Sequence, residues 1–423
     1  MYIPDYYEFC CRVNIVAGHD ALEIIPRLLS AMGANNPMIL TDKGVKAAGL
    51  VDILVQAVEK GLTIKCIEDD VPPDSDVNVV HRLARIYNET GCDSIIALGG
   101  GSVMDTAKGI NILVSEKADD LMQFTGAGAL KRKLKPLIAV PTTAGTGSEV
   151  TIIAVIADHD KNRKMLFTSY FLFPDAAVVD SRMTLTLPPH ITAATGMDAL
   201  AHAVEACTML SKNPLSDAHA KEAIYLIRTH LLDVIANPSN KEGRLALATA
   251  ATLAGIAFSN SMVAMVHGLG HSFGSVCHIP HGNCMAILLP YGLEYNLHKV
   301  EDRIGDLLFV LTGPETYAKT PEEQRALKTI AWIRQFNQDI CTATNGMHAT
   351  CFKDIKDKDQ NRRVPEEMLP DIALTAMGDG TAFYNPEDTD YDEWLMVAKA
   401  AWEGVPLDRT KNLSPKRTNR QLI

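Results

Sequence analysis

The stretch SIIALGGGSVMDTAKGINILV, residues 94–114, decides the fold class because it joins an apolar strand, a glycine turn and a helical segment. Residues 94–98 form a continuous apolar run, which is typical of a strand buried on both faces of a parallel sheet. Gly99, Gly100 and Gly101 follow, and glycine lets a backbone approach a ligand closely. The helix expected over residues 103–114 would direct its free amides and positive dipole end at an anion such as a phosphate.

The start of this helix is expected at Ser102, because Ser102 and Asp105 match an S-x-x-D capping box. The run is not the G-x-G-x-x-G dinucleotide fingerprint, since position 104 is Met. Taken alone, these residues are also compatible with a structural glycine turn that binds nothing.

Outward from this stretch, residues 20 to 180 alternate short apolar runs with amphipathic segments. Further strands are expected at residues 38–41, 62–67, 137–140, 151–157 and 176–179, and helices at 45–60 and 77–90. This rhythm predicts a parallel, Rossmann-like sheet covered on both faces. Ligands of such sheets bind at the carboxyl ends of the strands, so the turns there are the first candidates for a site.

Two further turns fit a dinucleotide. PTTAGTGS, residues 141–148, crowds hydroxyls and amides after a strand, and Thr142 and Thr143 are neutral donors suited to a pyrophosphate or ribose. Asp42 ends another strand, where its carboxylate would accept hydrogen bonds from a ribose and repel a 2′-phosphate, which favours NAD over NADP. As a single residue, Asp42 is more commonly a helix N-cap or turn residue.

Beyond Pro188 and Pro189 strand patterns nearly vanish. We therefore predict an α/β dinucleotide-binding domain over residues 1–187 and an all-helical domain over 188–423. Helices are expected at residues 191–209, 216–236, 241–260, 263–277, 281–297 and 324–344. Residues 355–368 are interpreted as a surface excursion, and 408–423 as a loosely held tail.

Histidines and one aspartate predict a metal site in the helical part. Asp198 and His202 are four residues apart, which places them on one helix face, and His267 and His271 repeat that spacing. A carboxylate with several imidazoles suits Fe²⁺ or Zn²⁺. A lone histidine in so apolar a stretch is more often a core residue, but the paired spacing favours a metal.

The composition excludes several classes of protein. The net charge of −11 argues against a nucleic-acid partner, and 47% hydrophobic with 22% charged residues is ordinary for a globular chain. We expect no transmembrane helix and no secretory signal. The nine cysteines form no C-x-x-C pair and are interpreted as reduced thiols, mostly core filler, in a cytoplasmic protein.

Four motifs in one order make the chain, over residues 9–404, similar to the iron-containing (group III) alcohol dehydrogenase family. They are GGGS at 99–102 with Asp105 and Lys108, PTTAGTGSEV at 141–150, GMDALAHAVE at 196–205, and HGLGH at 267–271 running to PHG at 280–282. The resemblance implies an N-terminal dinucleotide-binding domain, a helical C-terminal domain, and a cleft that holds a nicotinamide and a divalent metal. Residues 408–423 run past the usual end of the family.

The resemblance also implies roles for individual residues. The implied metal ligands are Asp198, His202, His267 and His281, with Fe²⁺ as the expected ion and Zn²⁺ as the alternative. The implied cofactor contacts are Asp42, Gly99, Gly100, Gly101, Ser102, Thr142, Thr143 and Lys164. His271 would contact the nicotinamide or join a proton path, and His278 has no ligand role that can be carried over.

The predicted reaction is reversible hydride transfer between NAD(H) and a small primary alcohol or its aldehyde, by a homodimer or higher homo-oligomer. Two other classes remain open from the sequence. One is a metal- and NAD-dependent lyase of the dehydroquinate synthase type, in which NAD is reoxidised in every cycle. The other is a non-catalytic metal-binding protein or a metallohydrolase whose glycine turn is only structural.

Overall fold

The computed structural model describes residues 3–158 and 163–407. These residues form two compact units, one of residues 3–158, 163–262 and 342–347, and one of residues 263–341 and 348–407. The division into domains after residue 187 stays a prediction. The tail expected at residues 408–423 lies outside the described residues.

The first unit is built on a six-stranded sheet in the order β1-β9-β6-β4-β2-β3, in which every pair of neighbours is parallel. Its strands are β1 (Asn14–Gly18), β2 (Pro37–Leu40), β3 (Cys66–Glu68), β4 (Ser94–Gly99), β6 (Leu137–Pro141) and β9 (Ala176–Asp180). β2, β4, β6 and β9 are buried throughout, as their apolar runs predict. The parallel sheet expected from the sequence is confirmed.

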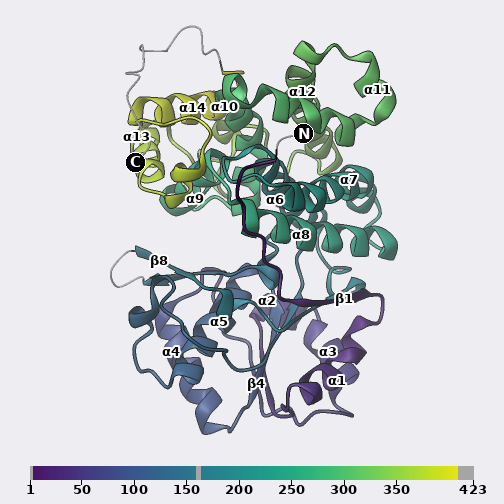
Figure 1. Cartoon of the computed structure of the whole chain (residues 1–423), viewed down its shortest axis with the longest axis vertical. Coiled ribbons are helices and arrows are strands. Elements are labelled where there is room, and N and C mark those ends of the chain that lie inside the picture. Colours follow the sequence, from purple (N-terminus) through teal and green to yellow (C-terminus); the bar gives the residue numbers. More distant parts are fainter. Residues whose placement is uncertain (1–2, 159–162, 408–423) are drawn as a thin grey trace. The chain divides into compact units, whose positions relative to one another are not determined.

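Helices cover both faces of this sheet, and β4 shows how (Figure 1). Ile95 and Ala97 pack with residues of α4 (Val77–Glu89) and α5 (Gly101–Glu116). Ile96 and Leu98 point the other way, because successive side chains alternate along a strand. They pack with residues of α1 (Ile25–Ala31) and α3 (Leu50–Val58). The short helix α2 (Lys43–Ala47) follows β2.

The strand expected at residues 151–157 belongs to a different sheet. It is β7 (Ile153–Asp158), which pairs antiparallel with β8 (Arg163–Thr168), and β5 (Gly126–Ala127) completes three strands. Val155 on β7 and Leu166 on β8 are exposed, as in a sheet covered on one face. β1, β5 and β8 were not predicted. β1 is an edge strand with largely exposed side chains, so it has no continuous apolar run.

Three long helices complete the first unit, and they follow the predicted ranges closely. They are α6 (Pro189–Thr208), α7 (Pro214–Ala236) and α8 (Lys241–Ser261). Arg244 on α8 is buried, and its guanidinium donates to Thr192 Oγ1 at 2.7 Å and to the Leu187 carbonyl at 3.0 Å. These bonds tie α8 to the start of α6 and the segment before it.

The second unit is helical. It contains α9 (Met265–Cys277), α10 (His281–Thr312), α11 (Pro314–Lys319), most of α12 (Glu322–Ala343), α13 (Leu369–Met377) and α14 (Tyr391–Glu403). α10 runs past its predicted end, with non-helical dihedral angles at Val300. Residues 356–363 are mostly exposed, as expected, but Val364 is buried and accepts a hydrogen bond from Trp402 Nε1 at 2.9 Å.

Taken singly, no helix in the described ranges has the length and apolar composition to cross a membrane, although the successive helices α8 and α9 together meet that criterion. The helical fold class of the C-terminal part is confirmed.

Candidate functional site

Two glycine-containing loops lie side by side where β4 and β6 end. The Thr142 amide donates to the Gly99 carbonyl at 3.1 Å. A Cβ added at Gly100 would lie 3.2 Å from Thr143 Oγ1, and one at Gly101 would lie 3.2 Å from Thr146 Cγ2. Glycine therefore suits this close approach, because a Cβ would press on the threonine side chains, and the two loops form one polar edge at the carboxyl ends of neighbouring parallel strands.

The helix α5 begins at Gly101 with Gly100 as its N-cap, so the predicted capping box is wrong. Ser102 lies inside the first turn and donates to the Pro73 carbonyl. Asp105 turns inward, where it accepts from Ser148 Oγ at 3.1 Å and from the Val155 amide at 3.0 Å. Because Gly100 has no side chain to cap the helix, the amides of the first turn are those that a phosphate would use.

A buried ammonium fixes the second loop. Lys108 Nζ has five oxygen atoms within hydrogen-bond distance, from Ser148, Thr151 and Ile153, at 2.7–3.2 Å. Burial lowers the pKa of Lys108 to about 8, against the opposing effect of the Asp105 and Glu149 carboxylates. Burial also raises the pKa of Asp105 and of Glu149. This network holds the backbone that follows the loop.

Asp42 has the structural role that single-residue reasoning favours. It is the N-cap of α2, and its Oδ1 accepts from the Val45 amide at 2.9 Å. Its predicted contact with a ribose stays a prediction. Lys164 lies on β8, half exposed, with its Nζ 3.6 Å from Asp74 Oδ1. Its predicted cofactor contact also stays a prediction.

The acidic candidate ligand lies on α6. Asp198 and His202 are both buried, and His202 Nδ1 lies 3.8 Å from Asp198 Oδ1, as their spacing on one helix face predicts. The His202 ring stacks on Phe258 with centroids 4.2 Å apart. A Cβ added at Gly145 would lie 3.0 Å from Asp198 Oδ2, so the second glycine loop runs directly against this carboxylate.

Three imidazoles gather in the second unit. His267 and His271 come from α9, and His281 is the first residue of α10. The ring centroid of His281 lies 5.5 Å from that of His267 and 5.5 Å from that of His271. His267 is buried, whereas the His271 side chain is 45% exposed. His271 is thus the most exposed of the three rings, and His281 is partly buried.

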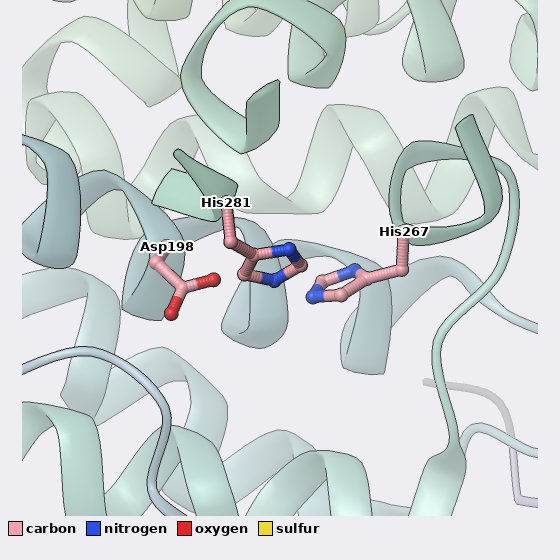
Figure 2. Close-up of side chains that lie close together, drawn as sticks. All are labelled: Asp198, His267 and His281. Atoms are coloured by element: carbon pink, nitrogen blue, oxygen red, sulfur yellow. The ribbon is translucent and has the colours of Figure 1, made fainter. Parts of the chain in front are cut away.

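Asp198, His267 and His281 form a group that could hold a metal ion. Each offers one ligand atom, and these atoms lie within 4.8 Å of one another. Figure 2 shows the carboxylate and the two rings turned toward one another. One carboxylate with imidazole nitrogens is a donor set that fits Fe²⁺ or Zn²⁺. His202 as the fourth ligand stays a prediction.

Sequence reasoning missed Asp379, which lies far along the chain from its partner. Its Oδ2 is 2.9 Å from His271 Nδ1, and its Oδ1 accepts from the Thr381 amide at 2.9 Å. Burial acts to raise the pKa of Asp379, but the hydrogen bond and charge of His271 outweigh it, and the pKa falls to about 2. The Asp-Gly pair at 379–380 signals only a turn.

His278 has no place in this cluster of rings. It ends α9 in a left-handed conformation with φ of 54°, and its carbonyl accepts from Arg363. The sequence assigns His278 no ligand role. It also does not predict that His278 caps the C-terminus of α9.

The comparisons with known proteins decide the family. The profile described as iron-containing alcohol dehydrogenase matches residues 13–181, and the profile of the C-terminal part of the Fe-containing alcohol dehydrogenase family matches residues 192–402. The chain belongs to the iron-containing alcohol dehydrogenase family. The resemblance expected from the four motifs is confirmed, as are the enzyme class, an NAD-dependent alcohol dehydrogenase, and the cofactors, NAD and Fe²⁺.

Relatives of this dehydrogenase match most of its length. It is 33% identical to the 1,3-propanediol dehydrogenase of Klebsiella pneumoniae, over 91% of this chain and 96% of that one. It is 33% identical to the NAD-dependent methanol dehydrogenase of Bacillus methanolicus, over 77% of this chain and 84% of that one. A crystal structure of a 1,3-propanediol oxidoreductase superposes with a TM-score of 0.87 at 31% identity, covering 94% of this chain and 100% of that one.

Proposed function

We propose that this dehydrogenase transfers a hydride reversibly between NAD(H) and a small primary alcohol or its aldehyde, with one Fe²⁺ ion bound by Asp198, His202, His267 and His281. The observation that carries the proposal is the convergence of ligand atoms from Asp198, His267 and His281 within 4.8 Å. When bound, a divalent ion supplies Lewis acidity toward the oxygen of an alcohol or aldehyde.

The glycine edge supports the cofactor half of the proposal. Gly99, Gly100, Gly101 and Ser102 surround the start of α5, where amides suit a pyrophosphate. Thr142 and Thr143 contribute hydroxyls from the adjoining loop, and the Asp42 carboxylate would accept from the ribose and disfavour a 2′-phosphate. Lys164 completes the proposed contacts. The chain's role is to hold the cofactor in line with the substrate carbon, because the hydride chemistry belongs to the nicotinamide.

His271 would move the alcohol proton. Asp379 stays ionised across the neutral range and accepts from the Nδ1 side of the ring, which leaves Nε2 as the acceptor. The half-exposed ring can then pass a proton to water. Asp379 is a positioning residue in this scheme, since it acts through His271.

The proposal also covers the oligomeric state, the localisation and the size of the substrate. We expect a homodimer or higher homo-oligomer, since most oligomers are symmetric assemblies of one chain. We expect a cytoplasmic enzyme that binds neither nucleic acid nor membranes, which is supported by its net charge of −11 and by nine cysteines that form no disulfide. The alcohol itself is a small one, as methanol and 1,3-propanediol are in the names of two relatives.

The experiment that tests the proposal reconstitutes the apoprotein separately with Fe²⁺, Zn²⁺ and Mn²⁺ and screens NADH oxidation against short aldehydes. We expect oxidation of NADH in step with aldehyde reduction, with the highest rate for Fe²⁺. His267→Ala should bind less metal, as measured by atomic absorption. The proposal fails if His267→Ala retains full metal or if no aldehyde consumes NADH. Conversion of a substrate with NAD unchanged in net amount would instead indicate the lyase class.

A further inference from the structure

Two cysteines lie together at the margin of the sheet in the first unit. Cys66 is the first residue of β3, and Cys92 lies between α4 and β4. Their Sγ atoms are 3.8 Å apart, although 26 residues separate them in the chain. Both side chains are half-buried and pack against the edge of the hydrophobic core that includes α4 and α5. A small solute can therefore reach the pair from solvent.

We propose that Cys66 and Cys92 are a redox modification site that closes reversibly to a disulfide when the enzyme meets a hydroperoxide. The Cys92 thiolate attacks one oxygen of hydrogen peroxide, the O–O bond breaks, and a sulfenic acid forms as hydroxide leaves and takes up the proton that the Cys92 thiol had released. The Cys66 sulfur then attacks Cys92 Sγ, so the S–S bond forms while the oxygen and the thiol proton leave as water. Two thiols lose two electrons, and hydrogen peroxide is reduced to two waters.

The geometry needs only a small closure. A disulfide requires Sγ atoms about 2.05 Å apart, so the two sulfur atoms, now 3.8 Å apart, must approach by less than about 2 Å. Thr90 lies beside both thiols, with its Oγ1 3.2 Å from Cys92 Sγ and 3.7 Å from Cys66 Sγ. Thr90 Oγ1 is itself held by the Ile86 carbonyl at 2.7 Å. The last turn of α4 thus supports the pair in its present orientation.

The two thiols differ in their ionisation, which assigns their roles. The hydrogen bond from Cys66 lowers the pKa of Cys92 to about 7, with Thr90 and Lys65 acting in the same direction and burial and Asp93 opposing them. The same hydrogen bond, together with burial, raises the pKa of Cys66. The lowered pKa favours the Cys92 thiolate, the form that reacts with peroxide. Cys66 keeps its proton until it resolves the sulfenic acid.

A bond at this place would close the chain around the loop after β3 and around α4. The denatured chain would lose conformational freedom, so the oxidised enzyme should unfold at a higher temperature than the reduced one. This readout does not depend on the enzyme's substrate, and the inference does not rest on the proposed function.

The test treats the full-length reduced enzyme with a small molar excess of hydrogen peroxide at neutral pH. Free thiols are then alkylated, and unreduced peptides are analysed by mass spectrometry. We expect a peptide that joins Cys66 to Cys92 in most molecules, its disappearance after dithiothreitol, and a Tm several degrees above that of the reduced sample. Sulfinic or sulfonic acid on Cys92 without the linked peptide would overturn the proposal, as would no oxidation of the pair.

Variants separate the two steps. Cys66→Ser should stop at the sulfenic acid, which dimedone traps on Cys92, and Cys92→Ser should leave Cys66 reduced. Cys11→Ser is the matched control, because Cys11 is an exposed thiol outside the pair, and it should form the linked peptide as the wild type does. A link that joins other cysteines or two subunits contradicts the proposal. The wild-type peptide map decides the question even if a variant does not fold.

Discussion

Asp379 orients an imidazole that carries a proposed proton path, so its replacement should affect catalysis more than metal binding. In Asp379→Asn the His271 ring loses its charged acceptor. We expect kcat to fall about tenfold, with little change in KM and with full metal content. His271→Ala should lower turnover further with its metal also retained. Unaltered turnover in His271→Ala would remove the ring from the proton path.

The Asp379 carboxylate should make the free energy of unfolding depend on pH in the acid range. The pKa of Asp379 is about 2 in the folded enzyme against a usual value of 3.8, so the folded state binds its proton less readily than the unfolded state does. The stabilisation from Asp379 is full above about pH 4 and is lost as the pH falls toward 2. Urea unfolding of wild type and Asp379→Asn should therefore show a difference in free energy that narrows below pH 4. A difference that widens there contradicts this assignment.

Gly145 leaves room for the carboxylate of Asp198. An added Cβ would lie 2.9 Å from Thr195 Cβ and 3.0 Å from Asp198 Oδ2, so Gly145→Ala must displace one of them. We expect lower metal content in this variant. Gly18→Ala is the matched control, because its Cβ would meet only the Ala21 Cβ at 4.0 Å. Equal metal content in the two variants would show that the loop does not set the position of the carboxylate.

At the scale of elements, the start of α5 and the loop after β6 act as one surface. A valine at Gly100 would press on Thr143, whose Oγ1 lies 3.2 Å from the site of the new Cβ. Gly100→Val should weaken NADH binding about tenfold, measured by quenching of NADH fluorescence, while the metal content stays at the wild-type value. Unchanged NADH affinity in Gly100→Val would indicate that the glycine turn has only a structural role.

The elements that the sequence predicts best are those whose pattern is unambiguous. The strands β2, β4, β6 and β9 are buried on both faces, so their apolar runs are continuous, and α6 to α8 carry long periodic stretches. β1 escapes because it lies at the edge of its sheet and exposes most of its side chains. β8 is the middle strand of the small sheet, but its exposed Lys164 and Leu166 alternate with buried Met165 and Phe167, so it has no continuous apolar run. The capping box predicted at Ser102 is wrong for another reason. Ser102 and Asp105 form hydrogen bonds with Pro73 and Ser148, which are distant in the sequence, and a local motif does not predict such partners.

The candidate site is predictable only in part. Spacing on α6 and α9 brings Asp198 next to His202 and places two of the imidazoles, because helical periodicity is local. The partner of His271 is not predictable, since 108 residues separate it from Asp379 and a lone Asp-Gly turn has no distinctive chemistry. The thiol pair is hidden in the same way, because its residues meet only once β3 and α4 are folded.

At the scale of the whole molecule, metal removal should reduce both stability and activity. A ligand that binds the folded chain and not the unfolded one stabilises the fold by mass action, about 4 kcal/mol at a thousandfold excess over Kd. Chelation should lower the Tm by several degrees and abolish NADH oxidation, and Fe²⁺ should restore both. An identical Tm with and without metal would contradict binding at Asp198, His267 and His281.

The buried ammonium of Lys108 has a practical consequence. Since it is almost wholly covered and held by oxygens of three residues, acylating and methylating reagents that label surface lysines should pass it by in the native enzyme. Its labelling rate then measures how often the segment from Ser148 to Ile153 comes away from α5, which gives an intrinsic chemical gauge of local opening.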